Sequence, residues 1–237
     1  MSLPKLALFD LDHTLLPIDS DYSWGQFTAA RGWADPVEFT RQNDAFYAQY
    51  KAGTLDIYEY ARFATAAFVR QGEAQSLAAH ADYMRTVVMP AIKPQALQLV
   101  QQHKDEGATI IVVTATNEFV TRPIAQALGA DELMAVDIER DMRPGGTGWF
   151  TGEVRGIPSF REGKVQRVEA WLTARGWGWA DVHSTFYSDS INDLPLLEKA
   201  NVPVATNPDD PLRAIAQARG WRILELFNQV PDSGATG

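Results

Sequence analysis

The chain has no cysteine, no long apolar run and an excess of acidic over basic residues, and each of these features excludes a class of protein. Without cysteine there is no disulfide bond and no thiolate metal site, as expected of a cytoplasmic protein. No stretch approaches the roughly 18 apolar residues of a membrane-spanning helix, and no signal peptide is visible. The net charge of −9 argues against nucleic acid or an anionic membrane as the main partner. The 4 histidines show no ligand spacing.

The most informative segment is an apolar run, Leu6 to Phe9, that stops at two aspartates, Asp10 and Asp12. The run predicts a short buried strand, and two carboxylates at its end are costly unless a cation compensates them. At positions i and i+2 of an extended backbone both side chains point the same way. This arrangement suits Mg²⁺ together with a nucleophile and a proton donor.

Polar residues follow two further predicted strands. The β-branched run 108–113 ends on Thr114, and the strand 183–187 is followed by a polar segment that contains Asp189, Asn192 and Asp193. Between them Lys164 stands at the start of a helical pattern. In open α/β sheets ligands bind beyond the carboxyl ends of the strands, so these groups are expected to converge. A hydroxyl, an ammonium and several carboxylates together predict a site for phosphate and magnesium.

These residues resemble the motifs of the haloacid dehalogenase superfamily of phosphatases. That family has Asp-x-Asp-x-Thr, a Ser or Thr after the second strand, a Lys and an acidic pair. Here the motifs occur in the same order, as Asp10-Leu11-Asp12-His13-Thr14, Thr114, Lys164, and Asp189 with Asp193. The resemblance implies an α/β fold, in which a helical cap of the C1 type is inserted into a Rossmann-like core with a doubly wound parallel sheet.

The insertion is predicted at residues 17–90, and the core at 1–16 and 91–237. The segment after the first motif is too long for one crossover helix, and its apolar spacing predicts helices between residues 20 and 88. The glycine-rich segment 143–152 is predicted as a β-hairpin, since no helix opens after it to make a nucleotide loop. Further helices are expected at 94–106, 117–128, 164–175 and 211–218, strands at 202–205 and 222–224, and a disordered tail at 232–237.

The resemblance also implies a role for each site residue. Asp10 attacks phosphorus to form an aspartyl phosphate, and Asp12, with a raised pKa, protonates the leaving alkoxide and then activates water. Mg²⁺ is held by Asp10, Asp189 and the main-chain carbonyl of Asp12. The phosphate-binding groups are then Thr114, the amide of Ala115, Lys164 and Asn192. Asp193 orients Lys164 or a metal-bound water.

The substrate is expected to be a small phosphomonoester with an amine. In phosphoserine phosphatases an acidic residue after the first motif meets the substrate ammonium, and Asp19 matches it. Their cap arginine, which binds the carboxylate, falls at Ala64 here, and Arg62 lies on a different helical face. Histidinol phosphate, an amine without a carboxylate, therefore fits best among subfamily IB substrates. Phosphoserine, a lipid head-group phosphate and another metabolite remain alternatives. Asp19 fits equally well as the N-cap of the following helix, a position for which Ser20 is the alternative.

Asp12 favours a phosphatase over a dehalogenase. A proton donor at this position serves an alkoxide leaving group, whereas halide leaves without a proton. A P-type ATPase needs membrane helices, which the sequence lacks. Phosphotransferase or mutase activity stays open, since an aspartyl phosphate can pass to an alcohol. The alternative of a different class is a binding or regulatory protein on an inactive scaffold, which predicts at least one broken catalytic position, and none is broken. The sequence predicts neither the oligomeric state nor a preference between Mg²⁺ and Mn²⁺.

Overall fold

The computed structural model describes residues 3–227, and the tail predicted to be disordered lies outside them. The strands are β1 (Lys5–Phe9), β2 (Ala108–Asn117), β3 (Glu132–Val136), β4 (Ile138–Arg140), β5 (Phe150–Val154), β6 (His183–Ser188), β7 (Val202–Thr206) and β8 (Arg222–Leu224). The helices are α1 (Ser20–Ala30), α2 (Pro36–Ala52), α3 (Ile57–Gln71), α4 (Glu73–Tyr83), α5 (Met89–Ala91), α6 (Pro94–Asp105), α7 (Glu118–Ala127), α8 (Glu162–Thr173), α9 (Leu194–Lys199) and α10 (Asp210–Arg219). Short helical turns are η1 (Met84–Val88, a π-helix), η2 (Trp179–Asp181) and η3 (Ile191–Asp193). Among the described residues no helix is both long and apolar enough to cross a bilayer.

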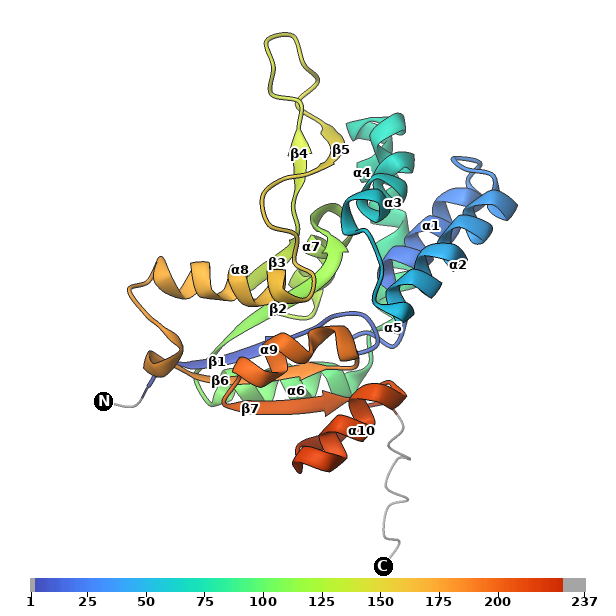
Figure 1. The fold of residues 1–237 in the computed structure, drawn as a ribbon. Helices are drawn as coiled ribbons and strands as arrows, with labels where there is room; N and C mark the ends of the chain where they lie inside the picture. The colour runs from blue at the N-terminus through green and yellow to red at the C-terminus, as the bar shows by residue number, and fades with distance from the viewer. Residues whose placement is uncertain (1–2, 228–237) are drawn as a thin grey trace, which may run out of the picture.

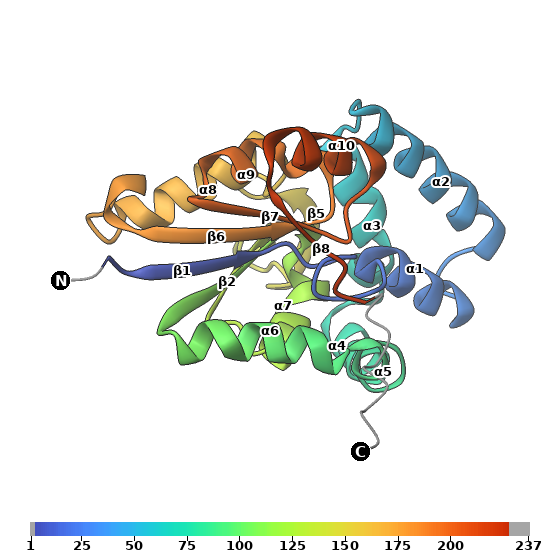
Figure 2. The same cartoon turned by 90° about the horizontal axis from the view of Figure 1, so that it is seen from below.

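The predicted doubly wound parallel sheet is confirmed. Six strands run parallel in the order β3-β2-β1-β6-β7-β8, so the chain winds outward in both directions from β1. Helices α6 and α7 cover one face of the sheet and α8, α9 and α10 the other (Figure 2). Because Phe9 pairs with both Val112 and Tyr187, the carboxyl ends of β1, β2 and β6 lie side by side. The polar residues after these strands must therefore meet.

Helices α1, α2, α3 and α4 gather beyond the carboxyl end of β1 (Figures 1 and 2). Helices α1, α2 and α3 each begin at an aspartate whose side chain accepts main-chain N–H bonds: Asp19, Asp35 and Asp56. The expectation that Asp19 is an N-cap is thus confirmed. Helix α2 is unlike its neighbours, because none of its side chains is buried.

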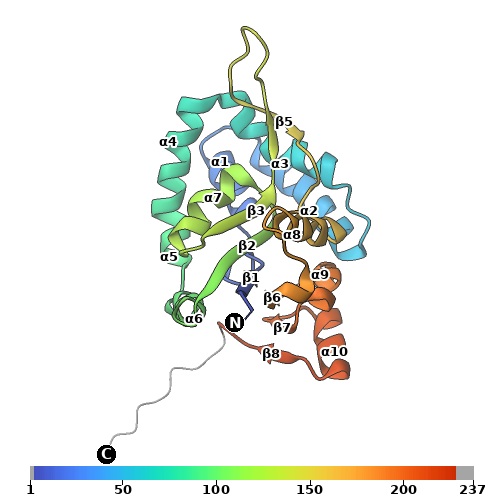
Figure 3. The same cartoon turned by 90° about the vertical axis from the view of Figure 1, so that its left-hand side faces the viewer.

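One hydrophobic core runs across the predicted boundary between cap and core. Trp24 of α1 and Phe68 of α3 both contact the ring of Phe119, which belongs to α7. The predicted hairpin is confirmed as β4 and β5, an antiparallel pair that lies beside α3 (Figure 3). Trp149 precedes β5, and its Nε1 donates to the carbonyl of Phe68 at 3.0 Å. The division at residues 17–90 remains a prediction, since this packing joins the two parts.

Among the longer elements, β3 and α9 were not predicted from the sequence. The apolar residues 133–136 carry the signal for β3, which pairs with the outer side of β2. Shifted boundaries of two other elements bear on the site. Strand β2 continues to Asn117, so Thr114 and Thr116 belong to it, and α8 starts at Glu162, which puts Lys164 in its first turn.

Candidate active site

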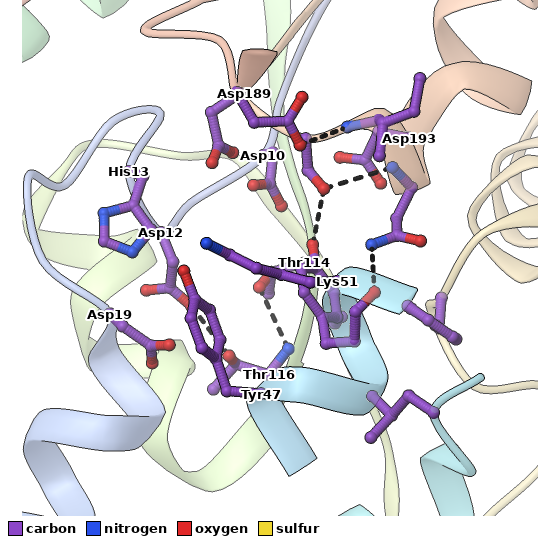
Figure 4. Close-up of a pocket in the computed structure, with 18 of the residues that line it drawn as sticks. Asp10, Asp12, His13, Asp19, Tyr47, Lys51, Thr114, Thr116, Asp189 and Asp193 are labelled. Carbon is purple, nitrogen blue, oxygen red and sulfur yellow. Dashed lines mark hydrogen bonds between the residues drawn. The ribbon is translucent and has the colours of Figure 1, made fainter. Parts of the chain in front are cut away.

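A cavity of about 340 Å³ opens at the carboxyl ends of β1, β2 and β6, with α2 and α3 forming its other wall. Figure 4 shows its lining. The structure brings all nine predicted site residues to this cavity: Asp10, Asp12, Asp19, Thr114, Ala115, Lys164, Asp189, Asn192 and Asp193. Segments more than 180 residues apart in the sequence thus meet in one pocket because the parallel sheet aligns their strand ends.

Lys164 links two carboxylates at the floor of the pocket. Its Nζ lies 2.8 Å from Oδ1 of Asp10 and 2.7 Å from Oδ2 of Asp193. Burial lowers the pKa of Lys164, but the two carboxylates raise it more, so the pKa lies above its ordinary value and the ammonium stays charged. Burial raises the pKa of Asp193 to about 6, although Lys164 opposes this shift. The predicted contact of Asp193 with Lys164 is present.

Asp189 is held by Thr14, whose Oγ1 donates to Oδ1 of Asp189 at 3.1 Å and accepts its main-chain N–H at 3.0 Å. The sequence motif contains Thr14, but no role was predicted for it. Burial, followed by the charges of Asp10 and Asp193, raises the pKa of Asp189 well above its usual range. A cation between Asp10 and Asp189 would relieve this repulsion.

The donor set fits magnesium. Among residues 3–227 no group of three or more His, Cys, Asp or Glu side chains forms a metal site. The predicted set has only two carboxylates, Asp10 and Asp189, and adds the main-chain carbonyl of Asp12. Such a set consists of hard oxygen donors and leaves positions for water, which Mg²⁺ retains in most protein sites.

Asp12 has surroundings different from those of Asp10. Its Oδ1 accepts the main-chain N–H of Ser20 at 2.8 Å, and its Oδ2 accepts the hydroxyl of Thr116 at 2.9 Å. No cation pairs with it in the described part of the chain. Burial first, and then the charge of Asp19, raises the pKa of Asp12 well above its usual range. The pKa of Asp12 is therefore raised, as predicted, but the main cause is burial rather than the neighbouring carboxylates.

A second acidic region lies where α1 and α3 meet the pocket. Asp19 caps α1 through a bond from the N–H of Tyr22 at 2.8 Å and also lines the cavity, so both interpretations of this residue agree with its position. Behind it, buried Asp21 accepts a bond from Nδ2 of Asn117 at 3.2 Å and shares one with the hydroxyl of Tyr60. Burial, followed by the charge of Asp19, raises the pKa of Asp21 to about 7.

We expect Asp21→Asn to change the pH dependence of stability. The folded protein holds the Asp21 proton up to about pH 7, whereas the unfolded chain loses it near pH 4. The contribution of this proton is therefore full below about pH 4 and is lost as the pH rises through 7. The amide does not titrate, so the stability of Asp21→Asn relative to wild type should rise by up to about 4 kcal/mol between pH 4 and 8. Urea unfolding at several pH values measures this, and a difference independent of pH would contradict the assignment.

The remaining predicted residues lie at the pocket in different ways. The hydroxyl of Thr114 is buried and accepts the N–H of Thr116 at 3.2 Å. Asn192 uses both ends of its amide, because Oδ1 accepts Nε of Arg161 at 3.0 Å and Nδ2 donates to the carbonyl of Tyr50 at 3.3 Å. The contact of Asn192 with phosphate therefore remains a prediction.

The cap wall of the pocket was missed by the sequence analysis. It consists of side chains from α2 and α3, namely Asn43, Phe46, Tyr47, Tyr50, Lys51, Ile57 and Tyr60. No motif marks these residues, and the aromatic ones resemble the neighbouring core residues in sequence. Neither Arg62 nor Ala64 lines the cavity, and Arg62 pairs instead with Glu153 of the hairpin at 3.2 Å.

Comparisons with known proteins agree with this arrangement. The profile of the haloacid dehalogenase-like hydrolases matches residues 7–198. Histidinol-phosphatase of Neisseria meningitidis serogroup C (strain 8013) is 38% identical over 225 residues, which are 94% of this chain and 100% of that protein. A crystal structure of a protein with unknown function from Bordetella pertussis Tohama I is 46% identical, with a TM-score of 0.88 over 95% of this chain and 100% of that one. A substrate-bound phosphoserine phosphatase shares the fold at 17% identity, with a TM-score of 0.67 over 95% and 94% of the chains.

Proposed function

Because the chain belongs to the haloacid dehalogenase-like hydrolase family and is a phosphatase, we propose that it is a Mg²⁺-dependent phosphomonoesterase acting on histidinol phosphate through an aspartyl phosphate. The observation that carries the chemistry is the contrast between two neighbouring carboxylates. Asp10 is paired with the ammonium of Lys164, whereas Asp12 accepts two hydrogen bonds and is paired with no cation among residues 3–227. One carboxylate suits a nucleophile and the other a proton donor. The lack of cysteine supports a cytoplasmic location.

In the proposed reaction a carboxylate oxygen of Asp10 attacks phosphorus, and the bond from phosphorus to the ester oxygen breaks. Asp12 gives its proton to the departing oxygen, so the product leaves as an alcohol. Asp12 then takes a proton from water, which attacks the aspartyl phosphate and releases inorganic phosphate. Asp10 and Asp12 thereby return to their starting states.

The phosphoryl group needs cations in this pocket. Two unit charges of the same sign about 4 Å apart repel by roughly 4 kcal/mol at an effective dielectric constant of 20. Lys164 supplies one positive charge, and Thr114 and Ala115, which line the pocket, would donate through a hydroxyl and a main-chain amide. Mg²⁺, held by Asp10, Asp189 and the carbonyl of Asp12, would neutralise phosphoryl oxygens in the transition state.

The acidic region supports a substrate with a cation at the end opposite to its phosphate. Asp19 lines the pocket without an ion pair among residues 3–227, and buried Asp21 lies behind it. The rings of Tyr47 and Tyr60 offer a surface on which an imidazole can stack. The name of the Neisseria relative supports the same substrate. A phosphoserine or lipid head-group phosphatase is the alternative, but no arginine among residues 3–227 lines the pocket to bind a carboxylate.

A substrate panel tests the proposal. Phosphate release is measured with Mg²⁺ on histidinol phosphate, phosphoserine, a phosphorylated lipid head group and other phosphorylated metabolites. We expect kcat/KM on histidinol phosphate to exceed the others by about tenfold or more, because a charged hydrogen bond contributes about 1.5–3 kcal/mol. Equal rates across the panel would leave the phosphatase and reject the substrate.

Asp19→Asn separates the two roles of this residue. Asparagine caps helices as well as aspartate does, so α1 should remain intact while the negative charge is lost. We expect KM for histidinol phosphate to rise by about tenfold or more, and KM for para-nitrophenyl phosphate, which has no cation, to stay nearly constant. Steady-state kinetics on both substrates measure the difference, with urea unfolding as the control for stability. An equal rise for both substrates would contradict a role in cation binding.

A further inference from the structure

The cap side of the pocket carries a lysine of its own, Lys51, in the last turn of α2. Figure 4 shows its side chain lying across the pocket in front of Thr114. The ring of Tyr47, one turn earlier on the same helix, lies 4.8 Å from Nζ of Lys51. A contact of an ammonium with an aromatic face is favourable, so Tyr47 helps to keep the lysine on the pocket side of the helix.

The two lysines of the pocket differ in what they bind. Lys164 is buried and already paired with Asp10 and Asp193. Lys51 is exposed and forms no ion pair with any carboxylate in residues 3–227. The pocket nevertheless has seven aspartates in its lining, Asp10, Asp12, Asp19, Asp189, Asp193, Asp209 and Asp210. The ammonium of Lys51 is therefore the positive charge of the pocket that remains available to an anionic ligand.

The C-terminal end of α2 is fixed to the loop beside the metal site. The hydroxyl of Tyr50 donates to Oγ of Ser190 at 2.8 Å, and Nδ2 of Asn192 donates to the carbonyl of Tyr50 at 3.3 Å. We call this pair of bonds the α2 latch. Ser190 and Asn192 lie between Asp189 and Asp193, so the latch holds the residue next to Lys51 against the loop that carries two site carboxylates. The latch therefore fixes the backbone of Lys51 relative to the end of the pocket that carries Asp189 and Asp193.

We propose that Lys51 is a substrate-binding residue, which contacts the phosphoryl group of the bound phosphomonoester from the cap side while Lys164 acts from the core side. This inference rests on the proposed function. A phosphomonoester brings nearly two negative charges among the carboxylates, and Lys51 offsets one of them without giving up an existing partner. The alcohol product has no such charge, so Lys51 favours the substrate over the dephosphorylated product.

The test is the binding of inorganic phosphate, measured by titration calorimetry in the presence of Mg²⁺. We expect the Kd for phosphate to rise about tenfold or more in Lys51→Met, since a charged hydrogen bond is lost. Lys51→Arg keeps the charge and should stay within about threefold of wild type. The matched control is Arg41→Met, which removes a positive charge from the same helix at a site outside the pocket, where Arg41 pairs with Glu38 at 2.7 Å.

Several outcomes would overturn the inference. An unchanged Kd in Lys51→Met excludes the phosphoryl contact. An equal rise of the Kd in Arg41→Met would mean that the loss of any positive charge on α2 weakens phosphate binding at long range. An unchanged Kd together with a higher KM for phosphoserine alone would assign Lys51 to a carboxylate instead. The proposed function fails separately, since it requires that the wild-type protein release phosphate from at least one phosphomonoester. Wild-type turnover with an unchanged Kd in Lys51→Met therefore rejects the role of Lys51 alone.

Discussion

Asp10→Asn is expected to lower the rate of phosphate release from every phosphomonoester by about 10⁴-fold or more. The amide cannot attack phosphorus as a carboxylate does. Among residues 3–227 the only other carboxylate paired with Lys164 is that of Asp193, which also accepts a bond from the hydroxyl of Ser188. Phosphate release over several hours with Mg²⁺ and saturating substrate measures the residual rate. A variant that keeps more than a few per cent of the wild-type activity would remove Asp10 as the nucleophile.

The matched control for this variant is Asp210→Asn, which removes an exposed carboxylate from the rim of the same pocket. It should keep its rate within about twofold, because screening by solvent weakens exposed charges.

Loss of activity in Asp10→Asn should not reflect unfolding. Asp10 raises the pKa of both Asp189 and Asp193, so removing its charge relieves repulsion as well as breaking the bond to Lys164. Urea unfolding of the three proteins checks this point.

Asp12→Asn should give the second largest loss, about 10²–10⁴-fold in kcat for alkyl phosphates, the usual contribution of general acid–base catalysis. The loss should depend on the leaving group. Para-nitrophenolate leaves without a proton, so the first step should survive on para-nitrophenyl phosphate. The second step still needs Asp12 to activate water, and the aspartyl phosphate should therefore accumulate.

Rapid mixing of Asp12→Asn with para-nitrophenyl phosphate distinguishes the two steps. We expect a burst of about one equivalent of para-nitrophenol per active site, followed by a slow steady rate. The double variant Asp10→Asn with Asp12→Asn is the control and should show no burst. A uniform loss on alkyl and aryl phosphates, without a burst, would mean that Asp12 acts only by holding the metal or the fold.

The core side of the site could be predicted from the sequence because its residues follow short apolar runs. Asp10 and Asp189 directly follow buried parallel strands, and Thr114 lies near the end of a third, so the sheet brings them together whatever the rest of the chain does. Lys164 could be placed because the resemblance gives its order along the chain. The strand β3 was missed, although the run 133–136 is apolar, since four residues do not distinguish a strand from a loop.

The cap side could not be predicted, because it depends on how helices sit against the core. Trp24 and Tyr60 both belong to aromatic patterns in amphipathic helices, yet Trp24 is buried in the core and Tyr60 lines the pocket. Periodicity gives a helix its apolar face but not the partner of each ring. Lys51 has the sequence context of an ordinary surface lysine. The cause of the raised pKa of Asp12 could not be predicted either, since burial is a property of the folded chain.

Helix α2 differs from the rest of the cap in a way that affects how substrate reaches the pocket. Trp24 of α1, Phe68 of α3 and His80 of α4 are buried, whereas α2 has no buried side chain in its 17 residues. The bond from Trp149 to Phe68 also ties α3 to the hairpin. Opening α2 alone breaks the two bonds of the α2 latch but exposes no fully buried side chain, so it should cost less free energy than lifting the whole cap. We therefore expect amide hydrogen exchange to be faster in α2 than in α3, and α2 to be the part of the cap that opens most readily for substrate.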